Sequence, residues 1–319
     1  MTQIADHVAF TPVNSKTVER RLRITVLSGG PGSEREVSLK SGRAVAAALK
    51  SLGHDVYLAD ISPEDLSALD RPVDMVFIAL HGAFGEDGQL QKILDDRRIR
   101  YCGSGPQASA MAMNKALAKS RFMEVGVPTP LFEVVTPDNI EQVLAQWTPP
   151  SVVKPLCEGS SVDCVIVHQG QDLEAPIRKE IEIYGQCMIE RFVKGSELTV
   201  GVLGDEPLPP IQIRPKREFY NYEAKYLDND TEYLFNIDLP ATLLGEICDL
   251  SVRAHQSLGC RDFSRVDWIV EESTNRPFAL EVNTIPGFTD HSLLPKAAQQ
   301  AGLGFSQLCQ RIVELTYLR

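Results

Sequence analysis

Three absences limit what this sequence can encode. No strictly apolar run exceeds six residues, as at 75–80, so we expect no segment that spans a bilayer. Positive charge is not in excess, and a formal net charge of −11 argues against nucleic acid and anionic membrane surfaces as partners. The seven cysteines include no CxxC pair, and their odd number and scattered positions indicate free thiols in a reducing compartment. Asp6 and His7 interrupt the apolar stretch that a signal peptide needs, so we expect a cytoplasmic protein.

The N-terminal part of the chain alternates between strand and helix patterns. A tail at residues 1–20 shows no periodicity. Strand-like segments follow at 22–27, 54–59 and 73–80, with helical segments at 38–52 and 89–96. This alternation is typical of βαβ units and a parallel sheet. We therefore expect an N-terminal α/β domain over 21–103.

The remainder mixes the two patterns differently. Between 104 and 192, helical segments at 104–125 and 173–184 and strands at 151–155, 162–167 and 186–192 predict an α+β unit. Strands at 197–203, 211–214, 266–270 and 278–282 and helices at 241–258 and near 305–313 follow. With 319 residues, 43% of them apolar, two or three domains are expected. The predicted fold class is α/β with an α+β central part.

Oxygen-bearing side chains gather near the end of the strand at 278–282. Glu281 and Asn283 are two residues apart, so they share one face of a strand. Asp267 begins the preceding strand, and an antiparallel pairing would bring all three together. Two carboxylates and an amide, without His or Cys, suit Mg²⁺ better than zinc. A surface salt bridge between Arg265 and one of the acids is the alternative.

Two glycine-containing loops are candidates for anion binding. "LSGGPGSEREVSLKSG" joins a strand to a helix, where backbone N–H groups can collect an anion, but it is not a GxGxxG fingerprint. Glu34 in this loop could hold an ammonium group or simply cap the helix. "VVKPLCEGSSVDC" carries Lys154 and Ser160 and has the composition of a flap over phosphates, or of a plain hairpin turn.

A polar stretch, "YNYEAKYLDNDTEY", has no apolar periodicity and is either a lid or a solvated connector. Together with "ALHGAFGEDGQLQ", "IERFVKGSELTVGVL", "SRVDWIV" and "LEVNTIPGFTDHSLLPKAA", and with the two loops above, it resembles the D-alanine–D-alanine ligases of the ATP-grasp superfamily. The resemblance runs from about Leu22 to the C-terminus. It implies a three-domain ATP-grasp architecture, with units at 21–103, 104–192 and 193–319. Asp163 departs from the family pattern, since relatives commonly have a small residue there, often Gly.

The resemblance also implies roles for particular residues. Lys115, Lys154 and Lys225 would contact the ATP phosphates. Glu190, Phe192 and Val193 would line the adenine pocket, and Glu197 would hold the ribose. The Mg²⁺ ligands would be Asp267, Glu281 and Asn283. Substrates would be bound by Glu34, His81, Ser292 and Leu293. Catalytic groups would be Arg265 and the Gly287 N–H, with Glu34, Ser160 and Tyr226 in a hydrogen-bonded array.

The activity that the resemblance implies is ATP-dependent ligation of two D-alanine molecules through an acyl phosphate, for peptidoglycan precursors. ATP is then a substrate, and two Mg²⁺ ions, which Mn²⁺ can replace, are cofactors. A homodimer is expected. The nearest alternative is another ATP-grasp carboxylate ligase, such as one making D-alanyl-D-lactate. A non-catalytic nucleotide-binding regulator would be expected to lose residues among Arg265, Asp267, Glu281 and Asn283, and all four are present. A dehydrogenase would need a dinucleotide-binding fingerprint, which is not evident in this sequence.

Overall fold

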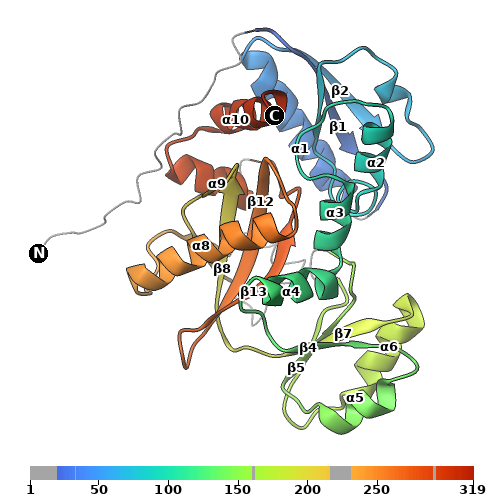
Figure 1. The fold of residues 1–319 in the computed structure, drawn as a ribbon, viewed down its shortest axis with the longest axis vertical. Coiled ribbons are helices and arrows are strands. Elements are labelled where there is room, and N and C mark those ends of the chain that lie inside the picture. Colours follow the sequence, from blue (N-terminus) through green and yellow to red (C-terminus); the bar gives the residue numbers. More distant parts are fainter. Residues whose placement is uncertain (1–19, 33, 160–161, 216–230, 290–291) are drawn as a thin grey trace, which may run out of the picture.

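The computed structural model describes residues 20–32, 34–159, 162–215, 231–289 and 292–319. Three sheets follow one another along the long axis of the molecule (Figure 1). Mixed α/β structure with a parallel N-terminal sheet confirms the predicted fold class. No helix in the described part of the chain is both long and apolar enough to cross a membrane. The boundaries expected at residues 103 and 192 stay predictions.

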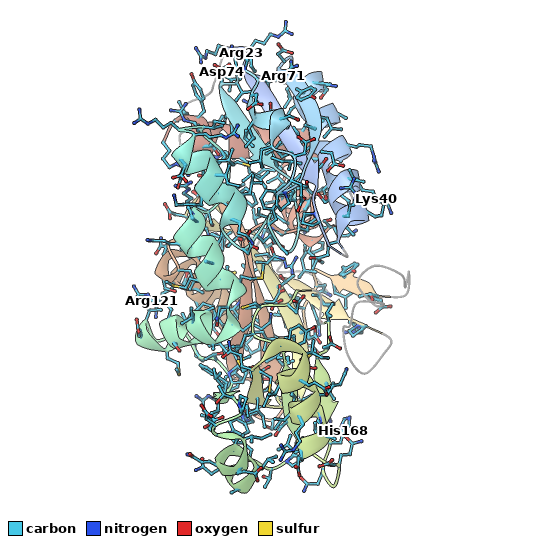
Figure 2. All side chains as sticks on the ribbon, turned by 90° about the vertical axis from the view of Figure 1, so that its right-hand side faces the viewer. Arg23, Lys40, Arg71, Asp74, Arg121 and His168 are labelled. Atoms are coloured by element: carbon cyan, nitrogen blue, oxygen red, sulfur yellow. The ribbon has the colours of Figure 1, made fainter. Side chains whose placement is uncertain are left out.

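The first unit contains a parallel sheet of order β2-β1-β3. Its elements are β1 (Arg23–Gly29), α1 (Arg35–Ser51), β2 (Asp55–Ile61), a 3-10 turn (Ser67–Leu69), β3 (Met75–Ile78) and α2 (Gln89–Asp96). The helix over 89–96 begins and ends as predicted, and the others shift by a few residues. Arg23 and Asp74 form an ion pair at the far end of this unit, away from His168 (Figure 2).

The second sheet is antiparallel, with the order β4-β7-β5-β6. Its elements are β4 (Phe132–Val135), α5 (Ile140–Gln146), β5 (Ser151–Lys154), β6 (Val165–Val167), α6 (Glu174–Tyr184) and β7 (Cys187–Arg191). Strand β4 and helix α5 were not anticipated from the sequence. The helices cover one face of the sheet, where Val143, Ile177 and Ile189 share a buried cluster.

The third sheet has the order β11-β10-β8-β12-β13, with β9 paired to β8. Its elements are β8 (Gly195–Leu203), β9 (Glu206–Pro207), β10 (Ile211–Arg214), β11 (Glu232–Leu234), α8 (Ala241–Ser257), β12 (Phe263–Glu271) and β13 (Pro277–Asn283). Helices α3 (Pro106–Met113) and α4 (Lys115–Glu124) pack here through Ala112 and Phe122. The helical structure predicted over 104–125 is confirmed for most of that range, but it is divided into two helices, because Asn114 ends α3 and its side chain caps α4.

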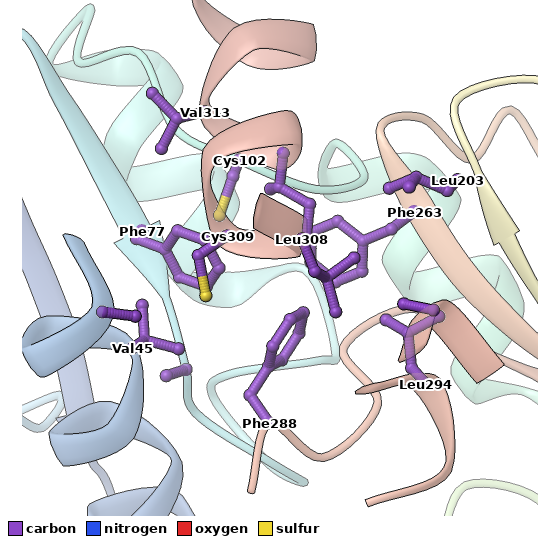
Figure 3. Close-up of a cluster of buried hydrophobic side chains, with 14 of the residues drawn as sticks. Val45, Phe77, Cys102, Leu203, Phe263, Phe288, Leu294, Leu308, Cys309 and Val313 are labelled. Atoms are coloured by element: carbon purple, nitrogen blue, oxygen red, sulfur yellow. The ribbon is translucent and has the colours of Figure 1, made fainter. Parts of the chain in front are cut away.

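Of the last two helices, α9 (Leu293–Gln300) packs against β8, and α10 (Phe305–Tyr317) returns to the first unit and lies beside α1 (Figure 1). The shared core contains Phe288, whose ring stands edge-on to Phe77 at 5.5 Å and to Phe263 at 5.3 Å between centroids (Figure 3). Aromatic contacts of this kind fix ring orientation as well as burying area. The loop that carries Gly287 is thereby held against both the first and the third unit.

Candidate active site

A pocket of about 690 Å³ lies where the second and third sheets face each other. This is within the range of about 300–1,000 Å³ that is usual for small-molecule sites. The residues predicted for the site that line it are Lys115, Lys154, Glu190, Phe192, Val193, Glu197, Arg265, Asp267, Glu281 and Leu293. Segments far apart in the sequence thus contribute to one cavity.

Strands β12 and β13 bring the predicted oxygen ligands together. Asp267 lies directly opposite Glu281, and Arg265 lies opposite Asn283 in the antiparallel register. The register shifts by one residue immediately after Asp267, and the pairing resumes at Trp268 and Ala279, so the acids lie next to an irregularity in the ladder. The juxtaposition that the period-two spacing predicted is confirmed.

Arg265 and Asp267 form a two-pronged ion pair. Arg265 Nε donates to Asp267 Oδ1 at 2.9 Å, and Nη2 donates to Oδ2 at 2.8 Å. Thr199 Oγ1 donates to the same Oδ1 at 2.6 Å. The salt bridge of the alternative interpretation therefore exists, but its side chains are only 13% and 17% exposed and line the pocket. Paired donors on a planar guanidinium fix its orientation.

The donor set at the end of β13 fits a hard cation. Asp267, Glu281 and Asn283 offer carboxylate and amide oxygens, the ligand type that Mg²⁺ prefers. Among the described residues, no group of three or more His, Cys, Asp or Glu side chains is arranged to hold a metal by itself. A site of this kind takes its remaining ligands from substrate oxygens and water, as is usual for Mg²⁺ bound to phosphates.

Glu190 is the centre of a buried charge cluster at the back of the pocket. Its carboxylate pairs with Lys154 and, at 2.9 Å, with Lys119. Burial alone would raise the pKa of Glu190, but Lys119 and Lys154 lower it to about 2, so the carboxylate is ionised. Burial opposes charge on Lys154 too, yet Glu190 raises its pKa overall. The cluster keeps a charged acceptor and donor facing the cavity.

Lys119 was missed by the sequence reasoning. Its side chain is fully buried and donates to Thr129 Oγ1 at 2.6 Å. Burial lowers the pKa of Lys119 to about 8, against the opposing attraction of Glu190. Lys115 and Lys119 are four residues apart on α4, and this spacing places both on one helix face, a signal that was available. Lys115 itself lies 3.5 Å from Glu281 Oε2.

Glu34 lies at the N-terminus of α1, but its side chain makes no capping hydrogen bond. A Cβ on Gly82 would lie 2.7 Å from Glu34 Oε2, and one on Gly159 would lie 3.6 Å from the same oxygen. The carboxylate therefore sits between the loop after β3 and the glycine loop after β5. This placement favours a ligand-facing role over the helix-cap interpretation.

His81 is buried beside this carboxylate. Its Nδ1 donates to the Ile285 carbonyl at 3.0 Å, and its Nε2 lies 3.1 Å from Ser41 Oγ. Burial lowers the pKa of His81, although the negative charge of Glu34 opposes the effect. The ring is accordingly neutral, with the Nδ1 proton assigned from the carbonyl acceptor.

Glu86 is a second buried residue that the sequence reasoning missed. It accepts hydrogen bonds from the backbone N–H of Gly82 at 2.6 Å and of Ile285 at 3.2 Å. Burial, and then the nearby Glu34, raise the pKa of Glu86 to about 8. It lies within the quoted "ALHGAFGEDGQLQ", but nothing local in that motif indicates its partner.

Gly287 and Ser292 approach each other closely. A Cβ on Gly287 would lie 2.6 Å from Ser292 Oγ, so only glycine leaves room there. Ser292 precedes α9 and its hydroxyl lies 2.8 Å from Thr289 Oγ1, while Leu293 is buried at the pocket wall. Three further predicted residues, Ser160, Lys225 and Tyr226, lie outside the described residues.

Comparisons with known proteins agree along the chain. The family models described as D-ala D-ala ligase N-terminus and C-terminus match residues 62–104 and 122–314. A D-alanine–D-alanine ligase of Gloeobacter violaceus is 44% identical over 92% of this chain and 99% of its own. The crystal structure of a Bacillus anthracis D-alanine–D-alanine ligase complexed with ATP is 32% identical, with a TM-score of 0.78 over 93% of this chain and 98% of that one. The VanG D-Ala:D-Ser ligase of Enterococcus faecalis is 27% identical, with a TM-score of 0.82 over 93% and 100%.

Proposed function

Because this chain belongs to the D-alanine–D-alanine ligase family, we propose that it joins two D-alanine molecules at the expense of ATP, for peptidoglycan precursors. One observation within the chain carries the proposal. Arg265 and Asp267 face Asn283 and Glu281 across two strands. Arg265, Asp267 and Glu281 line a pocket that also receives Lys115 and Lys154. A regulator that only binds nucleotide would have no need of this arrangement.

The nucleotide end of the pocket is built around Glu190. Its ionised carboxylate can accept from an adenine amino group, while Phe192 and Val193 supply apolar walls. The Phe192 ring stands edge-on to His168 at 6.5 Å between centroids. Glu197, from β8, is assigned to the ribose hydroxyls. Lys115 and Lys154 face the cavity, where their charges would stabilise the phosphates.

Asp267, Glu281 and Asn283 would hold Mg²⁺. When bound there, the ion neutralises charge on the phosphate oxygens of ATP. Arg265 and the lysines complete a positive environment on the same side of the pocket. Lys225 is assigned to the terminal phosphates, but it lies outside the described residues.

A carboxylate is a poor electrophile, so the first D-alanine must be activated. Its carboxylate oxygen attacks the γ-phosphorus of ATP, an O–P bond forms and ADP leaves, giving an acyl phosphate. Glu34 is placed to hold the ammonium group of this substrate, and neutral His81 lies near its carboxylate. The protein contributes mainly position and electrostatic stabilisation in such a step.

The neutral amine of the second D-alanine then attacks the acyl carbon. A tetrahedral oxyanion forms and collapses as the C–O bond to phosphate breaks, and the proton lost from the attacking nitrogen passes to the departing phosphate or to water. The Arg265 guanidinium, oriented by Asp267, and the Gly287 N–H are assigned to this oxyanion. Ser292 and Leu293 would bind the second substrate, and Ser160 and Tyr226 would orient the array that closes the site.

The test is phosphate release with ATP, Mg²⁺ and a panel of D-alanine, L-alanine, D-serine and D-lactate. We expect turnover with D-alanine and D-alanyl-D-alanine as the dominant product. Peptide formation should increase from about pH 6 toward about pH 9, because the attacking amine must be neutral. Absence of phosphate release with D-alanine would refute the activity. Preferred use of D-serine or D-lactate would change the second substrate alone. We also propose a homodimer, which light scattering can test.

A further inference from the structure

Strand β6 forms an edge of the second sheet and one wall of the nucleotide pocket. In the described part of the chain it pairs only with β5, through Val153–Val165, Val152–Ile166 and Ser151–Val167. Val162, Cys164 and Ile166 line the pocket. Val165 and Val167 instead pack in the cluster that contains Ile177 of α6. Side chains in and before β6 therefore alternate between the pocket and α6.

Asp163 lies between two pocket-lining residues and points to the other side. Its carboxylate accepts a hydrogen bond from the Tyr184 hydroxyl at 2.7 Å and from Lys179 Nζ at 3.2 Å. Both donors belong to α6, Lys179 at its middle and Tyr184 at its last residue. The backbone of Asp163 has φ +50°, a conformation that residues other than glycine adopt at some cost in free energy. The side-chain contacts therefore hold a backbone position that is not intrinsically favoured.

The two contacts are not equal. The Lys179 side chain is 58% exposed, so its ion pair with Asp163 is screened by water. The Tyr184 hydroxyl bonds an ionised carboxylate from a partly buried position, and the Asp163 side chain is 29% exposed. A hydrogen bond to a charged acceptor is stronger than a neutral one. Tyr184 should therefore provide most of the restraint.

We propose that Asp163, held by Tyr184 and Lys179 of α6, is a positioning residue that fixes Val162 and Cys164 in the pocket wall and thereby strengthens ATP binding. The inference rests on the proposed function, because it requires that this pocket binds ATP. Asp163 acts through its neighbours, since its own carboxylate points toward α6. The restraint is needed because β6 is short and, among the described residues, pairs with β5 alone.

The test measures binding of a non-hydrolysable ATP analogue by calorimetry, without D-alanine, and then KM and kcat. Tyr184→Phe removes one hydroxyl and should raise the dissociation constant roughly three- to tenfold. Asp163→Gly should raise the dissociation constant by a similar factor, although glycine removes the backbone strain at this positive φ. Lys179→Met should have an effect of less than about twofold. Tyr57→Phe, at an exposed tyrosine of the first unit, is the matched control and should bind as wild type does.

A positioning role makes further demands that a general loss of stability would not meet. The double variant Asp163→Gly with Tyr184→Phe should bind no more weakly than Asp163→Gly alone, because that single variant already removes the contact with Tyr184. Asp163→Asn, which keeps an acceptor and tolerates positive φ, should restore most of the affinity. The KM for ATP should rise while kcat at saturating ATP changes by less than about twofold.

The failure modes are distinct. If wild type binds the analogue and both Tyr184→Phe and Asp163→Gly bind equally well, the positioning role is refuted while the ligase function stands. Additive losses in the double variant would also refute it. If Tyr184→Phe does not fold, the comparison of Asp163→Gly with Asp163→Asn decides whether the positioning role holds. Equally weak binding of the ATP analogue by both would refute it. A wild-type protein that binds no nucleotide would overturn both proposals.

Discussion

The Glu86 carboxyl group accepts a hydrogen bond from the Ile285 backbone N–H at 3.2 Å, across 199 positions of the chain. The same side chain accepts from Gly82 N–H at 2.6 Å. One carboxyl group thus joins the loop after β3 to the loop after β13, between the first and third units. The Asn283 amide oxygen shares the Ile285 N–H at 3.1 Å, so this junction reaches the proposed metal ligands.

This junction predicts a pH-dependent stability. The pKa of Glu86 is raised from 4.5 to about 8 on folding, by burial and by Glu34. A raised pKa in the folded state means that its contribution to stability is complete below about pH 4.5 and is lost as the pH rises through about 8. We expect urea unfolding of wild type to show this decline and Glu86→Gln to show a flatter profile. Wild type and Glu86→Gln differ in this one titratable group, since His81 and all others are unchanged. Identical pH profiles would therefore contradict the raised pKa of Glu86.

Glu281→Gln removes one charge from the proposed Mg²⁺ site while nearly preserving shape. The side chain is 29% exposed and its ion-pair partner Lys115 lies 3.5 Å away, so little stability should be lost. Turnover should fall by at least about 100-fold, because the charge faces ligand. Steady-state kinetics at saturating Mg²⁺ are the measurement, with Glu124→Gln on the surface of α4 as control. Near-normal turnover would eliminate the metal assignment.

Lys119→Met tests the buried charge cluster. Lys119 is fully buried and lies 2.9 Å from Glu190, so its removal leaves Glu190 with Lys154 alone. We expect a loss of about 3 kcal/mol in the free energy of unfolding, the scale for breaking a buried pair. Lys92→Met, from an exposed pair on α2, should change stability little. Urea unfolding at neutral pH compares the two, and equal effects would show that the Lys119 charge is not needed.

The parts of the site that sequence predicted depend on local spacing. Residues 265, 267, 281 and 283 alternate on two short strands, so pairing the strands was enough to bring Arg265 opposite Asn283. Lys154 is the last residue of β5, within the strand that was predicted over 151–155. In these cases the period of the element already determines which side chains face the pocket.

The parts that sequence did not predict depend on contacts distant in the chain. The spacing of Lys119 from Lys115 indicates a shared helix face, but the burial of Lys119 and its ion pair with Glu190 follow only from the packing of α4 against the third sheet. The role of Glu86 depends on its hydrogen bond from Ile285, and no sequence periodicity connects these two residues. The return of α10 to α1 is likewise a tertiary contact, although both helices were expected. Short elements such as β4 and α5 are too brief for their patterns to stand out.

Arg265→Lys tests the step in which charge develops on oxygen. The guanidinium makes two bonds to Asp267, at 2.9 and 2.8 Å, and is 13% exposed, so its remaining N–H groups have a fixed direction. Lysine keeps the charge but cannot reproduce the two-pronged contact. We expect kcat to fall by about 100-fold, the scale for losing one oriented donor to an oxyanion. The dissociation constant for ATP should change much less, because Lys115 and Lys154 remain. If instead the loss appears only in the KM for ATP, Arg265 binds nucleotide and the oxyanion requires another donor.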